Sequence, residues 1–197
     1  NAGVAVTTGV QNTFIGGLAG DATTTANNNT AVGYFSLSAN TTGTANTAVG
    51  QNSLLTNTTA SNNTAIGRFS LRLNTTGANN TAVGYEALDK NTTAANNTAV
   101  GYASLNANTT GTQNVAVGSL AGDAMTTASY NTAVGYSALS SDTLGARNTA
   151  IGQEALASQN FTSATDSYNT AVGMNAGRLV TTGIENTLIG GLAGDAL

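Results

Sequence analysis

The sequence predicts an all-β protein, a parallel β-solenoid or β-roll of about eleven coils of 17 residues each. First, segments of the type Asn-Thr-Ala-Val-Gly recur every 17 residues from Asn12 to Asn148 and, after a shift of four residues, at Asn169 and Asn186. So short and strict a period is typical of coils stacked on one another. Second, Val or Ile always stands in the fourth place of the unit and Gly in the fifth. Third, residues 1–197 contain no Pro and no change in composition that would indicate a linker, so they form one continuous array.

The segment Thr-Ala-Val-Gly is predicted to be a short β-strand that ends at a turn residue. Strands of neighbouring coils would pair in parallel about 4.8 Å apart, so eleven coils make a rod of roughly 50 Å. The fourth-place residues then form a ladder along the rod, with Val32, Val49, Ile66, Val83 and Val100 among its members.

The rest of each coil is too short for a stable helix. Residues Tyr85–Lys90 contain good helix formers, but Gly84 and the triplet Asn91-Thr92-Thr93 leave fewer than two turns between them. We therefore expect a second short strand or a bend at Ala-Leu, in the eighth and ninth places. We expect a turn at Asn-Thr-Thr-Gly, in the twelfth to fifteenth places.

The Asn that starts each coil is predicted to form a structural ladder whose side-chain amides bond along the stack. Burial of one Val and one Leu in a coil cannot offset the entropy of ordering 17 residues, so the stacked neighbours must supply the difference. The ladder includes Asn29, Asn46, Asn63, Asn80 and Asn97.

Both faces of the strand carry apolar residues, because the third place is Ala in most coils, Phe14 in the first and Leu188 in the last. Neighbouring strand residues point to opposite faces. One face can line the coil interior, and the other requires a cover: an opposite strand of the same coil or, as we expect, a second chain.

Four coils have Gly instead of Leu in the ninth place. In these coils an apolar residue stands two places away, which predicts that the core is repacked at constant volume. The four runs are Gly16–Ala22, Gly118–Ala124, Gly173–Leu179 and Gly190–Ala196.

Composition argues against several classes of function. The chain has no Cys and no His, which removes Cys- and His-based nucleophiles and metal sites. A net charge of −4 argues against nucleic-acid binding, and no apolar run is long enough to cross a membrane. Carboxylate pairs such as Glu86 with Asp89 or Asp142 with Glu154 lack an accompanying pocket signal. We expect no enzyme activity, no cofactor and no metal.

Two surface features are candidate contact sites. Tyrosines after the strand Gly (Tyr34, Tyr85, Tyr102 and Tyr136) form a stripe that could bind sugars or, as we favour, shield the coils. Four extra residues near Asn160, Phe161 and Thr162 are predicted to bulge as a loop, and such insertions often decorate a binding face.

Threonine and asparagine rows leave further alternatives open. Rows such as Thr30, Thr47 and Thr64 would suit an ice-binding solenoid, although we place them at Gly- and Asn-rich turns where flatness is least assured. The Asn-Thr-Thr triplets at Asn40 and at four later places match the glycosylation sequon, but we interpret them as turn residues.

The units Asn-Thr-Ala-Val-Gly-Tyr-x-Ala-Leu-x-x-Asn-Thr-Thr-Gly and Asn-Thr-Phe-Ile-Gly-Gly-Leu-Ala-Gly resemble the repeats of bacteriophage tail fibres and bacterial surface fibres. They are more distantly similar to the coils of trimeric autotransporter adhesin heads. The resemblance covers the whole chain and implies a left-handed, trimeric β-roll that works outside the cell, on a cell surface or a virion. Such a rod would attach to a glycan or protein receptor. Because residues 1–22 match 175–196, we expect an internal segment of a longer fibre.

Overall fold

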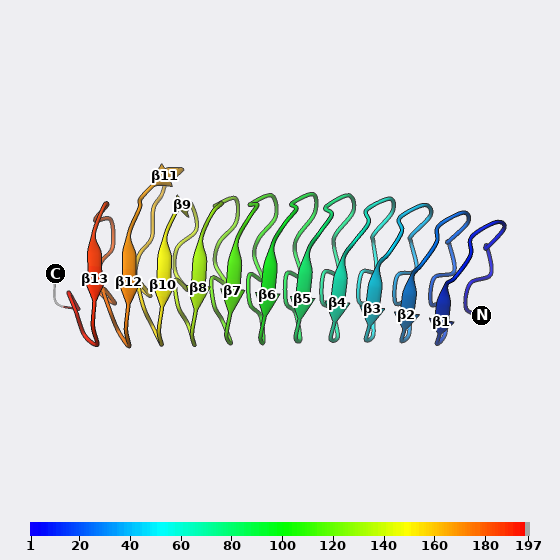
Figure 1. Ribbon diagram of the computed structural model, residues 1–197, viewed down its shortest axis with the longest axis horizontal. Helices are drawn as coiled ribbons and strands as arrows, with labels where there is room; N and C mark the ends of the chain where they lie inside the picture. Colours follow the sequence, from blue (N-terminus) through cyan, green and yellow to red (C-terminus); the bar gives the residue numbers. More distant parts are fainter. Residues whose placement is uncertain (196–197) are drawn as a thin grey trace.

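In the computed structural model, which describes residues 1–195, the chain winds as a solenoid into a long rod with its termini at opposite ends (Figure 1). One strand from each coil contributes to an 11-stranded parallel sheet, and a second sheet has only two strands. Strands are the only regular elements among these residues. They are β1 (Thr13–Ile15), β2 (Thr30–Val32), β3 (Thr47–Val49), β4 (Thr64–Ile66), β5 (Thr81–Val83), β6 (Thr98–Val100), β7 (Val115–Val117), β8 (Thr132–Val134), β9 (Gly145–Ala146), β10 (Thr149–Ile151), β11 (Thr165–Asp166), β12 (Thr170–Val172) and β13 (Thr187–Ile189).

The parallel solenoid predicted from the repeat is confirmed. Strand order in the large sheet follows the chain, and each residue pairs with its equivalent one coil later, as Thr81 does with Thr98. The pairing of β10 with β12 joins Thr149 to Thr170 and so absorbs the four extra residues. No second strand forms at Ala-Leu, where the chain makes a turn.

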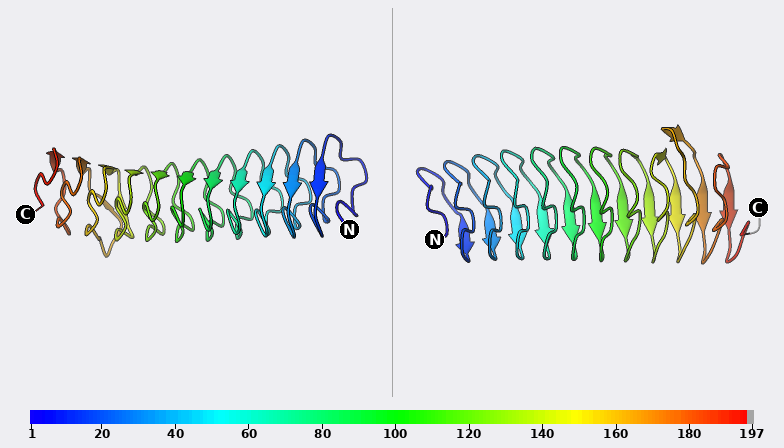
Figure 2. Two further views of the ribbon diagram at one scale, coloured as in Figure 1. Left: turned by 90° about the horizontal axis from the view of Figure 1, so that it is seen from below. Right: turned by 180° about the vertical axis from the view of Figure 1, so that it is seen from behind.

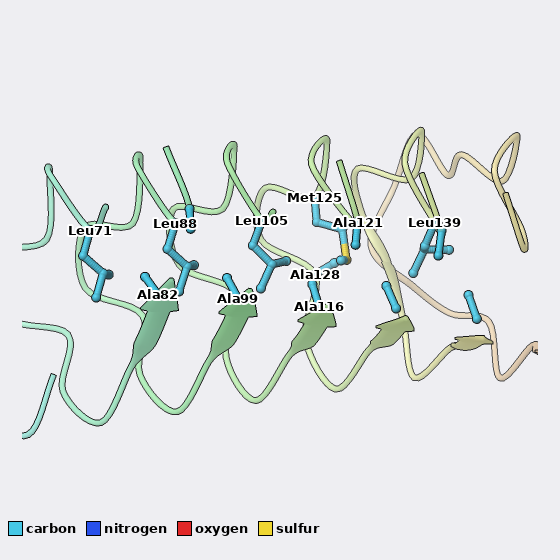
Figure 3. Close-up of a cluster of buried hydrophobic side chains, with 14 of the residues drawn as sticks. Leu71, Ala82, Leu88, Ala99, Leu105, Ala116, Ala121, Met125, Ala128 and Leu139 are labelled. Atoms are coloured by element: carbon cyan, nitrogen blue, oxygen red, sulfur yellow. The ribbon is translucent and has the colours of Figure 1, made fainter. Parts of the chain in front are cut away.

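The coil interior is lined by the third-place Ala and the ninth-place Leu, and not by Val. Ala82 and Leu88 are both 0% exposed, and the same pair recurs along the rod (Figure 3). The fourth-place side chains point the other way: Ile66 is 41% and Val117 37% exposed. The expectation that each coil buries its Val is therefore wrong for the single chain, because only the small Ala side chain fits between the strand and the facing Leu.

The Leu in the ninth place adopts a left-handed backbone conformation. Leu88, with φ 51°, and its equivalents all have positive φ, which costs roughly 1–2 kcal/mol per residue for a side chain with a Cβ. Complete burial of the Leu side chain offsets that cost. The four coils with Gly in this place avoid the strain, and Gly20, Gly122, Gly177 and Gly194 have φ between 55° and 64°.

Other apolar side chains fill the space of the missing Leu in these coils, as expected. However, these side chains do not belong to the residues two places away. Ring carbons of Phe14 lie 2.6–2.7 Å from the point that a Cβ on Gly20 would occupy. Met125 fills the equivalent space beside Gly122 (Figure 3), and Leu188 of the next coil lies beside Gly177. Leu179, two places from Gly177, is 46% exposed. Ala196, in the last of the four runs, lies outside the described residues.

The first-place Asn residues form the predicted ladder, in which most bonds run to the backbone. Two bonds join amides directly as predicted, because Nδ2 of Asn148 donates to Oδ1 of Asn131 and Nδ2 of Asn186 to Oδ1 of Asn169. The side-chain Oδ1 of Asn97 accepts a hydrogen bond from the Asn114 N–H at 2.9 Å, and its Nδ2 donates to the Gly111 carbonyl at 2.9 Å. Equivalent bonds recur at the other members from Asn29 to Asn169. Each buried amide therefore satisfies buried backbone groups of two coils.

Direct amide-to-amide bonding is regular at the twelfth place. Nδ2 of Asn74 donates to Oδ1 of Asn57 at 2.9 Å and to the carbonyl of Gly77, three residues on. This row runs through Asn40, Asn57, Asn74, Asn91 and Asn108, and all five are fully buried. The Asn residues of the sequons therefore lie inside the coil, where they stabilise the turn as expected. Because they are buried, they are not accessible to glycosylation in the folded chain.

Candidate functional surfaces

The largest regular surface of the rod is the outward face of the 11-stranded sheet, which we call the outer sheet face. Every outward side chain of these eleven strands is Thr, Val or Ile, and none is charged. Pairing is in register, so second-place and fourth-place residues form two rows along the rod, on strands that lie side by side in Figure 1. The second-place row is Thr except at Val115.

The threonine row therefore lies on the sheet and not at the turns. Thr30, Thr47 and Thr64 each begin a strand and are half-buried between their neighbours. The expectation that these residues occupy Gly- and Asn-rich turns is wrong, because the strand starts one residue after the Asn. The rows are consequently as regular as the sheet that carries them.

The tyrosine stripe is exposed, but its members do not form one open platform. Tyr34, Tyr102 and Tyr136 are more than half exposed. The rings of Tyr85 and Tyr102 stack with centroids 5.7 Å apart and an interplanar angle of 6°. On the preceding coil the Arg68 guanidinium carbon lies 5.8 Å from the Tyr85 centroid. The Tyr85 ring is thus flanked by side chains of both neighbouring coils, which favours shielding over sugar binding there.

The four extra residues form a ledge that projects from the rod (Figures 1 and 2). Thr143 still bonds to Asn160 with an offset of 17, but Thr165 pairs with Gly145 with an offset of 20. Three of the extra residues therefore lie between Asn160 and Thr165, as predicted. The chain then pairs β11 with β9 in parallel and returns to the main sheet at Asn169.

Phe161 is not a surface contact. It is 6% exposed, and its ring lies against Gly145, whose Cβ position would be 2.8 Å from a ring carbon. The Phe161 carbonyl accepts a hydrogen bond from the Thr143 hydroxyl. Phe161 therefore fixes the ledge to the coil wall, whereas Asn160 and Thr162 are exposed. The sequence does not indicate whether a large apolar side chain in an inserted loop points into the coil or toward solvent.

Beneath the ledge lies a groove of about 400 Å³. Its walls come from three successive coils and include Thr127, Ser129 and Tyr130 on one side and Thr165 and Asp166 on the other. Arg147 lies beside it, with its guanidinium carbon 4.6 Å from the Tyr130 centroid and 5.8 Å from that of Tyr168. Tyr130, Arg147 and Asp166 were not predicted from the sequence, since only the return of the ledge brings Asp166 to the other two.

The carboxylates considered as catalytic pairs are engaged in structural contacts. Asp142 is fully buried, accepts hydrogen bonds from the Gly145 N–H and from Gln159, and lies in the coil interior. Glu154 lies 3.8 Å from Arg178. Among residues 1–195 no group of three or more acidic residues could hold a metal ion, and no helix there is long and apolar enough to cross a membrane.

Asp89, the partner considered for Glu86, is a buried carboxylate. It is 4% exposed and receives two hydrogen bonds from Arg72 of the preceding coil, at 2.8 and 2.9 Å. Burial raises the pKa of Asp89, and the Arg72 guanidinium acts in the opposite direction with a smaller effect. Asp89 therefore stabilises the fold most when protonated, and that contribution falls as the pH rises through its folded pKa.

We expect Arg72→Met to destabilise the chain by about 2 kcal/mol at pH 7 and by clearly less at pH 4. Without the guanidinium the pKa of Asp89 rises further, so more of the stability is lost as the carboxyl ionises without a partner. Arg147→Met, which removes the exposed pair with Asp166, should cost below about 1 kcal/mol. Urea denaturation of both variants at the two pH values measures this, and an equal loss at pH 4 and pH 7 would contradict it.

Comparison of the chain with protein-family models, with curated proteins and with solved structures finds no match.

Proposed function

We propose that this chain is a segment of a structural and adhesive fibre, in which copies of the same chain pack together through their outer sheet faces. The main observation in support of this proposal is the unbroken row of fourth-place Val and Ile on that face. Contiguous β-branched apolar side chains without charges are unusual on a surface exposed to water and are typical of interfaces. A cover over this face would bury the row.

The regular spacing of the face favours a second copy of this chain as its cover. A parallel copy presents the same coils with the same rise, so each Val meets an equivalent residue at the same height. A globular partner without the repeat could match only a few coils. Three copies around one axis, with coils wound left-handed, is the assembly that the resemblance to adhesin heads implies.

The adhesive part of the proposal concerns what projects from the assembled rod. The exposed tyrosines and the ledge, which projects from the rod in Figure 2, are the candidate contact features outside the outer sheet face. We place the fibre outside the cell, on a bacterial surface or a virion, with a surface glycan or a protein as the receptor. In this role the stacked coils hold the contact sites at a fixed distance along a rigid rod.

The oligomeric state tests the proposal. We expect residues 1–197 to sediment as a trimer, and Val83→Lys/Val117→Lys to sediment as a monomer with an unchanged β-type circular dichroism spectrum, because the new charges lie in the centre of the interface. The matched control is Thr76→Lys/Thr110→Lys, which places two charges on exposed turns with the same two-coil spacing. A wild-type monomer, or a trimer that persists in the Val double variant, would contradict the proposal.

Ice binding is the second candidate, favoured by the location of the Thr row on the sheet beside the Val row. Flat, regular rows of Thr on a solenoid are the feature of such proteins, and here the outer sheet face would stay uncovered in a monomer. This alternative predicts thermal hysteresis that is lost in Thr64→Tyr/Thr98→Tyr. The fibre predicts a trimer without hysteresis, so one purified sample discriminates the two.

A further inference from the structure

The ledge creates a surface hollow on one side of the rod. In the coils before the ledge, the turn region of one coil lies directly over that of the next, held by bonds such as that from the Thr92 N–H to the Thr109 carbonyl. Beyond Phe161 the chain leaves this stack, pairs β11 with β9 and overhangs the turn of the coil that starts at Asn114. The groove beneath is about 400 Å³, within the range of pockets that hold small molecules.

The side chains around this groove are held in place by one another. Arg147 is stacked between Tyr130 and Tyr168, which belong to the coils before and after it. Its Nε lies 3.2 Å from the Asp166 carboxylate of the ledge. Ser129 is fixed through its hydroxyl oxygen, which accepts a hydrogen bond from the Thr112 N–H at 3.0 Å. Contacts that hold binding groups before a ligand arrives reduce the entropy lost on binding.

The chemistry of the lining selects a class of ligand. Tyr130 is about half exposed and offers an aromatic surface, while Thr127, Ser129, Thr165 and Asp166 offer hydroxyl and carboxylate groups. Arg147 and Asp166 neutralise each other, so the site has no excess charge that would attract an anion or a metal ion. An apolar ligand would leave these polar groups without hydrogen-bond partners. A ligand that carries many hydroxyl groups and also has apolar C–H faces fits this lining best.

We infer that the groove beneath the ledge binds a neutral saccharide unit, with the Tyr130 ring against a sugar face and Asp166 accepting hydrogen bonds from sugar hydroxyls. This inference deepens the proposed function, since it assigns the receptor contact of the fibre to one site on one coil. A single site of this size and exposure binds weakly, in the millimolar range, and repeated copies in a fibre raise the overall affinity.

Saturation-transfer NMR with the full chain tests the inference, using glucose, galactose, mannose and N-acetylglucosamine as probes and N-acetylneuraminic acid as a charged comparison. We expect signals from at least one neutral sugar. Tyr130→Ala and Asp166→Asn should each weaken its binding about tenfold or more. Tyr136→Ala is the matched control, because Tyr136 is exposed to the same degree and lies outside the groove. Circular dichroism melting shows that each variant is folded.

Absence of a signal from every neutral sugar would overturn the inference, and so would binding that survives in both Tyr130→Ala and Asp166→Asn. A stronger signal from N-acetylneuraminic acid than from the neutral sugars would overturn the neutral assignment. Sedimentation of the same samples separates this failure from failure of the fibre proposal. A trimer that binds no sugar would support the fibre proposal and contradict the saccharide site. A monomer that binds sugar would support the saccharide site and contradict the fibre proposal.

Discussion

Gly84→Ala should destabilise the chain by roughly 4 kcal/mol, the largest loss expected from adding one methyl group to this protein. Gly84 has φ 137°, where a residue with a Cβ is strained. The new Cβ would also stand 2.7 Å from the carbonyl carbon of Gly101 on the next coil. That neighbour is backbone held in the stack, so it cannot move aside without opening the sheet. Thermal and urea unfolding at fixed protein concentration measure the loss.

Gly190→Ala separates the two contributions to this effect. Gly190 has nearly the same backbone conformation, with φ 123°, but no atom lies within 4 Å of its Cβ position because no coil follows it in the described chain. Only the backbone strain of about 1–2 kcal/mol then remains. Equal losses in the two variants would show that the close stacking of coils at this glycine contributes nothing, contrary to the structure.

Asn97→Ala should cost about 2–3 kcal/mol, because the side chain is the partner of one buried backbone N–H and one of two donors to a buried carbonyl. Truncation leaves the Asn114 N–H without its bond of 2.9 Å to Asn97, and it removes one of two hydrogen bonds to the Gly111 carbonyl, which keeps the one from Asn108 Nδ2 at 3.0 Å. Each unsatisfied buried group costs about 1–3 kcal/mol. Hydrogen exchange at the Asn114 amide offers a local measurement besides global unfolding, and we expect it to accelerate.

The adjacent Asn96 is the matched control for this substitution. Asn96 is exposed at the last place of its coil, with φ 62°, and Ala45 occupies the equivalent place with φ 56°. Asn96→Ala should therefore cost no more than about 1 kcal/mol, the preference of Asn over Ala for this backbone conformation. Similar losses at Asn96 and Asn97 would contradict a specific role for the buried ladder.

Much of the fold could be predicted because the repeat leaves few arrangements open. A strict 17-residue period with Val-Gly in fixed places requires one strand per coil and equivalent residues above one another. The position of the extra residues near Asn160 followed from the break in the period. It was also predictable that another side chain would fill the volume of the lost Leu, but not which one. Met125 fills the space beside Gly122, and Leu188 fills that beside Gly177. Which side chain reaches this space depends on the shape of the coil cross-section.

The candidate contact sites were less accessible to sequence reasoning. Phe161 was predicted at the surface and is buried, because the direction of a side chain in an insertion depends on how the chain returns to the stack. Tyr130, Arg147 and Asp166 are ordinary polar and aromatic residues within the repeat, and only the pairing of β11 with β9 brings Asp166 to the other two.

The sequence by itself determined the solenoid, its period, its strand positions and the buried Asn that starts each coil, because these features repeat and repetition restricts each coil to the same conformation. The tertiary structure alone decided which strand face lies inside. On most strands of the large sheet Ala stands between Thr or Val and a Val or Ile, and this alternation by itself does not decide which face is buried. The narrow space opposite the fully buried Leu accepts Ala and directs Val and Thr outward, and so creates the face on which the proposed function depends.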